Sequence, residues 1–143
     1  MTRLNSLPER YQDQIEQKKN SGDNTKLIIP GELPTMNEII NQSKIHWSKY
    51  KKMKETYDSI VAFYAEQQRV KLFKSVKLEI IYYRKDRRVD PDNLSAGKKF
   101  IIDGLVQAGV LEEDGWSEIK GFSESWKVDK DNPRTEINFE EVE

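Results

Sequence analysis

Hydrophobic and polar positions recur along the chain with two different periods, and each period predicts a type of element. A short apolar run over Lys26–Leu33 contains a Pro-Gly pair near its end, which is typical of a strand. Val76, Leu78, Ile80 and Tyr82 alternate with Lys77, Glu79, Ile81 and Tyr83, which predicts a second strand with one face on the core. Two more strands are expected near Glu118–Val128 and Thr135–Phe139, with Asp131–Pro133 as the turn between them.

A period of three to four residues predicts two helices between these strands. After a loop through Met36–Glu38, the first helix is expected over about Ser43–Gln68. Its predicted buried face consists of Trp47, Tyr50, Met53, Tyr57, Ile60, Val61 and Tyr64. The second helix is expected over about Leu94–Ala108, with Asn93 as its N-cap and Gly109 at its C-terminal end.

The order of elements is therefore βαβαββ, which predicts an α+β domain with four strands and two main helices. Residues 26–143 are expected to form this domain. Residues 1–25 are polar, contain only a short predicted helix around Pro8–Lys19, and are interpreted as an N-terminal appendage.

Composition narrows the classes of protein that remain. A chain of 143 residues with 36% hydrophobic content suits one compact domain. The sequence has no apolar run that could cross a bilayer and no apolar signal core, so we expect a soluble, cytoplasmic protein without a membrane partner. Without cysteine and with His46 as the one histidine, disulfides, thiolate metal sites and multi-histidine zinc centres are excluded. Any metal must be held by oxygen ligands.

Charge is segregated along the chain, although the net charge is only −1. Residues 44–99 contain fifteen Lys and Arg against seven Asp and Glu, whereas residues 111–143 contain four against eleven. A local basic surplus favours contact with nucleic-acid phosphates. The alternative interpretation is that these lysines solvate exposed helix and strand faces.

The segment Asp90-Pro91-Asp92-Asn93 is the most informative motif. Two carboxylates two residues apart in a proline-stiffened segment can point toward one hard cation. The motif could instead be a turn with helix caps. A calcium EF-hand is excluded, because Ser95 stands where that loop needs glycine and Ile101 where it needs glutamate.

Two further acidic features follow this motif. Lys99 and Asp103 are four residues apart and share a helix face, which is also the spacing of a surface salt bridge. Glu112, Glu113 and Asp114 are consecutive acids in a loop that contains glycine. Such a cluster is stabilised by a bound cation, although it could equally be an exposed acidic loop.

These residues together resemble the signature of the RusA-type Holliday junction resolvases. The resemblance is carried by Arg87–Leu94, Lys98–Leu105, Ala108–Val110 and Glu113-Asp114, and extends more loosely from the first strand to the last. It implies a mixed α/β fold and a homodimer that cleaves four-way DNA junctions, using Mg²⁺ or Mn²⁺. Many members of the family occur in phages and prophages.

The resemblance also implies roles for particular residues. Asp90, Asp92 and Asp114 match the metal-binding catalytic acids, and Glu113 is a further candidate ligand. Lys99 matches the catalytic lysine when the alignment is anchored on Asp103, with Lys98 as the second choice. This chain has three additional residues, Ser95–Gly97, relative to the shorter family pattern.

A nuclease of this kind needs basic residues that hold DNA phosphates. The candidates are Arg84, Lys85, Arg87, Arg88 and Lys98, together with the first-helix lysines Lys49, Lys51, Lys52 and Lys54. No small-molecule substrate is expected. The competing hypothesis is a non-catalytic nucleic-acid-binding module, in which the acids serve only as caps and turns. It also remains open whether Asp114 reaches Asp92 by its loop folding back along the helix or is supplied by a dimer partner.

Overall fold

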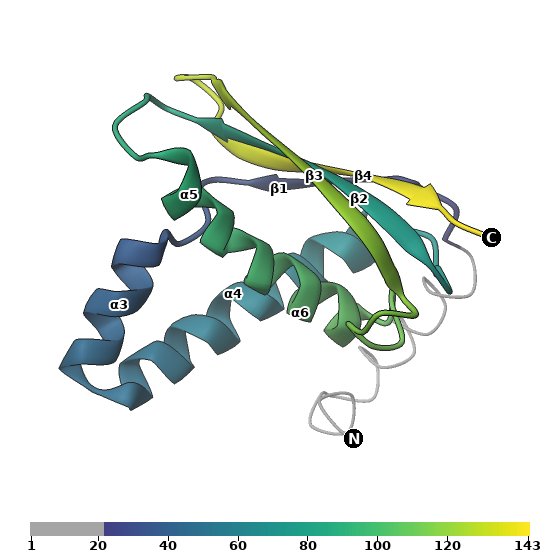
Figure 1. Cartoon of the computed structure of the whole chain (residues 1–143), viewed down its shortest axis with the longest axis horizontal. Helices are drawn as coiled ribbons and strands as arrows, with labels where there is room; N and C mark the ends of the chain where they lie inside the picture. The colour runs from purple at the N-terminus through teal and green to yellow at the C-terminus, as the bar shows by residue number, and fades with distance from the viewer. Residues whose placement is uncertain (1–21) are drawn as a thin grey trace.

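The computed structural model describes residues 22–143 and shows an α+β domain (Figure 1). The predicted helix around Pro8–Lys19, and most of the predicted appendage, lie outside the described residues. No helix in the described part of the chain is both long and apolar enough to cross a membrane.

Four strands form one mixed sheet, at the positions that the sequence predicts. They are β1 (Lys26–Pro30), β2 (Val76–Arg84), β3 (Ile119–Val128) and β4 (Arg134–Glu141), in the spatial order β1-β4-β2-β3. β4 is antiparallel to both of its neighbours, and β3 is parallel to β2. The turn after β3 therefore joins two strands that are not paired, because β2 lies between them.

The helices lie together on one face of the sheet (Figure 1). They are α3 (Met36–Ile45), α4 (Trp47–Gln67), α5 (Pro91–Leu94) and α6 (Lys98–Ala108), and a single 3-10 turn connects α5 to α6. The core lies between the two layers. Its fully buried members come from strands and helices alike: Leu27, Ile29, Val61, Val76, Leu78, Ile80, Ile101, Leu105, Leu111 and Ile137.

The prediction for the first helix was wrong at its start. The predicted loop through Met36–Glu38 is the first turn of α3, which begins with a capping box between Thr35 and Glu38. This reciprocal pair satisfies the backbone donors of a first helical turn, so the helix starts there. The extended backbone of His46 then separates α3 from α4.

The predicted buried face of the first helix is also only partly right. Trp47 is 65% exposed, and the residues of α4 that are buried are Asp58, Val61, Ala62 and Ala65. The start of α4 extends beyond the sheet, as Figure 1 shows, so its apolar residues find less to pack against.

The second predicted helix begins earlier than expected and is interrupted. Asp90 is the N-cap residue and Pro91 opens α5, where its fixed φ suits the first helical position. Asn93, the predicted cap, lies inside α5, and its side chain accepts a hydrogen bond from the backbone N–H of Asn37. The predicted glycine end is confirmed, since Gly109 has a φ of 78°.

Candidate functional site

The loop between β2 and α5 carries two of the predicted acids on an exposed surface. Asp90 and Asp92 are both exposed. The Asp90 side chain does not cap α5, and Asp92 accepts one hydrogen bond, of 3.0 Å, from the backbone N–H of Asn93. The proline at the first position of α5 fixes the backbone between the two carboxylates. Both carboxylates are therefore accessible to a cation or to water.

The start of the same loop is held by Glu32. Its carboxylate accepts a hydrogen bond from the backbone N–H of Lys85 and lies 3.3 Å from Nε of Arg84. Arg84 is therefore largely neutralised and is only 14% exposed. Lys85, Arg87 and Arg88 are exposed, and Arg88 forms a loose pair with Asp86 at 3.6 Å.

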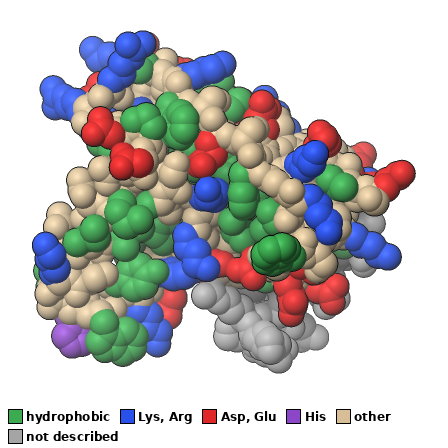
Figure 2. Space-filling view, in the orientation of Figure 1, with side chains coloured by type: hydrophobic (Ala, Val, Ile, Leu, Met, Phe, Trp, Pro, Cys, Tyr) green, Lys and Arg blue, Asp and Glu red, His purple; other side chains and the backbone are tan. Residues whose placement is uncertain are grey.

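A cavity of about 250 Å³ lies beside Asp90. It is lined by Arg84 at the end of β2, by Asp86 and Arg87 of the loop, and by Trp126 and Lys127 of β3. Figure 2 shows Lys and Arg side chains gathered over the β2–α5 loop, with acidic side chains directly beside them. Both charge types that a metal-assisted phosphodiester reaction requires are therefore present at this end of the molecule.

The second acidic loop follows α6. Glu112, Glu113 and Asp114 are exposed, and Leu111 before them is fully buried, which anchors the loop to the core. Asp114 lines a cavity of about 490 Å³ together with Lys99 and Ile102 of α6 and Trp116, Lys120 and Phe122. The loop thus turns back far enough for Asp114 and Lys99 to line the same cavity.

The two acidic loops are separate in one chain. They lie at opposite ends of the α5–α6 segment in Figure 1, and the cavities beside Asp90 and Asp114 share no lining residue. Within residues 22–143, no three His, Asp or Glu side chains gather closely enough to hold a metal ion. Asp114 and Glu113 are therefore not brought together with Asp90 and Asp92 in a single chain.

The donors at the first loop nevertheless fit Mg²⁺. This ion is commonly bound through one or two carboxylates, with water and substrate phosphates completing its ligands. Asp90 and Asp92 supply two carboxylates from one rigid segment.

The two candidate lysines of α6 have different surroundings. Lys98 lies 3.1 Å from Glu124, and its ammonium is 4.7 Å from the centre of the Phe122 ring. Lys99 is 58% exposed and lies 3.3 Å from Asp103, so the surface salt bridge suggested by their spacing is present. Lys99 is the more accessible of the two lysines.

Lys54 is held differently from the other lysines of the first long helix. Its ammonium contacts Asp58, at 2.7 Å, and Asp103 of α6. Burial lowers the pKa of Lys54, but the hydrogen bonds to Asp103 and Asp58 outweigh it and hold the pKa above its ordinary value. Lys54 is thus a charged link between α4 and α6, whereas Lys49, Lys51 and Lys52 are exposed.

Sequence reasoning missed a polar cluster on β3. Glu124 accepts hydrogen bonds from the Tyr82 hydroxyl, at 2.8 Å, and from Lys98. Burial, followed by the bond to Glu124, raises the pKa of Tyr82 well above its ordinary value. Trp126 stacks on Tyr82, with ring centres 6.2 Å apart. The pattern of β3 could have indicated that Glu124 and Trp126 share one face of the strand. The sequence could not show that β3 pairs with β2, which places Tyr82 beside them.

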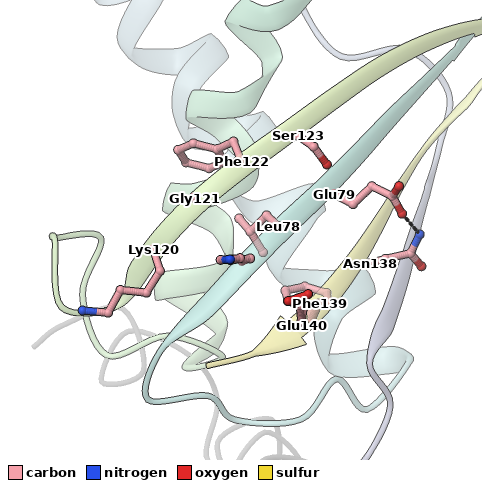
Figure 3. Close-up of a pocket in the computed structure, with 10 residues that line it drawn as sticks. Leu78, Glu79, Lys120, Gly121, Phe122, Ser123, Asn138, Phe139 and Glu140 are labelled. Atoms are coloured by element: carbon pink, nitrogen blue, oxygen red, sulfur yellow. Dashed lines mark hydrogen bonds between the residues drawn. The ribbon is translucent and has the colours of Figure 1, made fainter. Parts of the chain in front are cut away.

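The other face of the sheet carries a cavity of about 580 Å³ (Figure 3). Glu79 of β2 accepts a 2.7 Å hydrogen bond from Asn138 of β4 across it, and Ser123 and Lys120 lie along β3. None of the residues predicted to act in catalysis lines this cavity.

Comparison of the chain with protein-family models found no match, and comparison with curated proteins found none either. The resemblance to RusA-type resolvases therefore depends on the motif residues alone.

Proposed function

We propose that this protein is a metal-dependent endodeoxyribonuclease that resolves Holliday junctions and related branched DNA. The observation that carries the proposal is the exposed Asp90 and Asp92 pair, fixed by Pro91 and adjoining the basic residues of the same loop. Exposed carboxylates beside exposed arginines suit a site that binds both a cation and an anionic phosphate.

Asp90 and Asp92 would hold Mg²⁺ or Mn²⁺ through their carboxylate oxygens. When bound, the ion would supply a water of lowered pKa and a positive charge at the phosphate. Lys85, Arg87 and Arg88 would hold the DNA backbone and orient the scissile phosphate. Because these side chains would contact phosphates and not base edges, we expect weak sequence preference.

Lys99 and Asp114 form the second part of the proposed site. They line one cavity. There the Lys99 ammonium would stabilise the negative charge that develops on the scissile phosphate in the transition state. A junction has two strands to cut, and a twofold dimer would offer two sites in matching geometry. We therefore propose a homodimer, in which Asp114 completes the acidic set either through a loop movement or from the partner subunit.

The test is cleavage of a labelled four-way junction, a flap and a linear duplex, each with and without Mg²⁺. We expect cleavage of the junction into nicked duplexes only when Mg²⁺ is present. Asp90→Asn and Asp92→Asn should each lower the cleavage rate by more than about a hundredfold. Losing a residue that only supports a metal ligand costs about tenfold to a hundredfold, so losing a ligand itself should cost more.

Asp86→Asn is the matched control, because Asp86 is an acid of the same loop that pairs with Arg88 and is not in the proposed set. It should keep most of the activity. If native protein with Mg²⁺ binds the junction but never cuts it, the nuclease proposal is wrong.

One observation favours a second function. Lys85, Arg87 and Arg88 are exposed and would hold DNA phosphates without any need for catalysis. In that case the wild-type protein would bind the junction without cutting it, and Asp90→Asn would leave junction binding unchanged.

A further inference from the structure

Three exposed aromatic side chains follow one side of the molecule, on β3 and just before it. They are Trp116, Phe122 and Trp126, with 96%, 43% and 39% of their surface exposed, and we call them the aromatic edge. β3 is the last strand of the sheet, and no strand in the described part of the chain pairs with its outer side.

The aromatic edge extends from one proposed half-site to the other. Trp116 and Phe122 line the cavity that contains Asp114 and Lys99. Trp126 lines the cavity that contains Asp90. Phe122 and Trp126 are four residues apart on one strand, so they share a face of β3 about 13 Å apart.

Of the two rings on β3, one lies beside a lysine ammonium and the other is stacked on a buried aromatic ring. The Lys98 ammonium lies over the Phe122 ring, and Trp126 is stacked on the buried Tyr82, which fixes the plane of its indole. The cavities at the two ends add exposed lysines, Lys99 and Lys120 at one and Lys127 at the other. Aromatic rings interleaved with lysines are the usual surface for an unpaired nucleic-acid strand, because bases stack on the rings and phosphates meet the cations.

We propose that the aromatic edge binds unpaired, unstacked DNA bases, such as those exposed at a branch point. The choice of DNA as the nucleic acid rests on the proposed function. A second copy of the chain is a weaker explanation of the exposed rings, because lysine is depleted in the cores of interfaces between proteins and here lines the cavities at both ends of the aromatic edge. An unpaired strand on this edge would span the distance between the Asp90 and Asp114 cavities.

The experiment measures fluorescence anisotropy of labelled oligothymidylate, and of a duplex of equal length, with full-length protein in EDTA. We expect Trp116→Ala and Phe122→Ala each to weaken oligothymidylate binding by about fivefold to a hundredfold, the range for one lost base stack. Duplex binding should not change. Phe63→Ala is the control, since Phe63 is a similarly exposed aromatic residue on α4, outside the aromatic edge.

Wild-type affinity for oligothymidylate in both edge variants would overturn the inference. So would a sedimentation experiment in which Trp116→Ala converts a dimer to a monomer while oligothymidylate affinity stays unchanged, because the edge would then be an interface between copies. Asp90→Asn separates this inference from the nuclease proposal, as it should stop cleavage and leave oligothymidylate binding intact. If wild-type protein cuts nothing but the edge variants still lose binding, the nuclease proposal fails and this inference stands.

Discussion

The two edges of the sheet differ in how they are finished. At the β1 edge, the side-chain amide of Gln68 donates to the carbonyl of Ile28, at 2.7 Å, and accepts from the N–H of Ile28, at 2.8 Å. At the β3 edge, no strand pairs with the outer side among residues 22–143, and aromatic rings are exposed along it. An open strand edge invites pairing with other chains, so proteins commonly cover the edges that have no function.

The same contrast extends to the helix layer. Between the two long helices, α4 and α6 approach so closely at Gly104 that an added Cβ would lie 2.4 Å from Cβ of Val61. Toward β3, the two acidic loops and the aromatic edge are exposed. The closed half, made of β1, α4 and the contact of α4 with α6, stabilises the fold, and the open half exposes its charged and aromatic side chains to solvent.

The largest expected effect on stability is that of Lys54→Met in the closed half. Lys54 is 24% exposed and joins Asp58, which is buried, to Asp103. Removing the cation leaves a buried carboxylate without its ammonium partner, so we expect a loss of about 3 kcal/mol in the free energy of unfolding, measured by urea denaturation. The pKa of Lys54 is raised, so its contribution is complete below pH 10.5 and is lost only as the pH rises through the folded-state value.

Lys99→Met is the matched control, because Lys99 pairs with the same Asp103 from the exposed side. Surface pairs contribute about 0–1 kcal/mol, so this variant should denature almost as the wild type does. Equal losses in the two variants would contradict the division into a closed and an open half.

Glycine substitutions give the next effect in size. Gly104→Ala places a methyl group against Val61 and 2.8 Å from the backbone oxygen of Asp58, so α4 and α6 must separate. Overpacking of this kind costs about 1–3 kcal/mol, partly offset by about 1 kcal/mol of better helix propensity. We expect a net loss of up to about 2 kcal/mol, seen as a lower midpoint of thermal unfolding.

Gly121→Ala tests the same change in the open half. Its added Cβ meets only Cγ of Lys77, at 3.8 Å, which is ordinary contact. The unfolding midpoint should stay within the range of a neutral surface substitution, and a drop as large as that of Gly104→Ala would show that β3 is as tightly packed as the helices.

The smallest effect is expected from Gln68→Ala at the β1 edge. The variant loses both hydrogen bonds to Ile28, but water can replace them because Ile28 is partly exposed. We expect about 1 kcal/mol of destabilisation together with concentration-dependent self-association, measured by light scattering. Gln67→Ala, the exposed neighbour, is the control and should change neither quantity. An oligomeric state unchanged from that of the wild type would show that Gln68 does not protect this edge.

Several parts of the fold followed from local pattern. The strand positions could be predicted because alternation over Val76–Tyr83, or the Pro-Gly end of the first strand, is encoded by neighbouring residues. The start of α3 was missed, although Thr35 and Glu38 have the spacing of a capping box and could have revealed it. The interruption by Ser95–Gly97 was less predictable, since Gly97 packs against Leu33, which is distant in sequence.

The candidate site divides in the same way. By itself, the sequence determined that Asp90 and Asp92 lie close together, because only Pro91 separates them in the chain, and that basic residues adjoin them. Only the tertiary structure decided that Asp114 lines a different cavity, that Lys54 is neutralised by Asp58 and Asp103, and that β3 is an exposed edge. Neighbouring residues set the local conformation, but the partners of a side chain and the exposure of a strand depend on contacts between segments far apart in the chain.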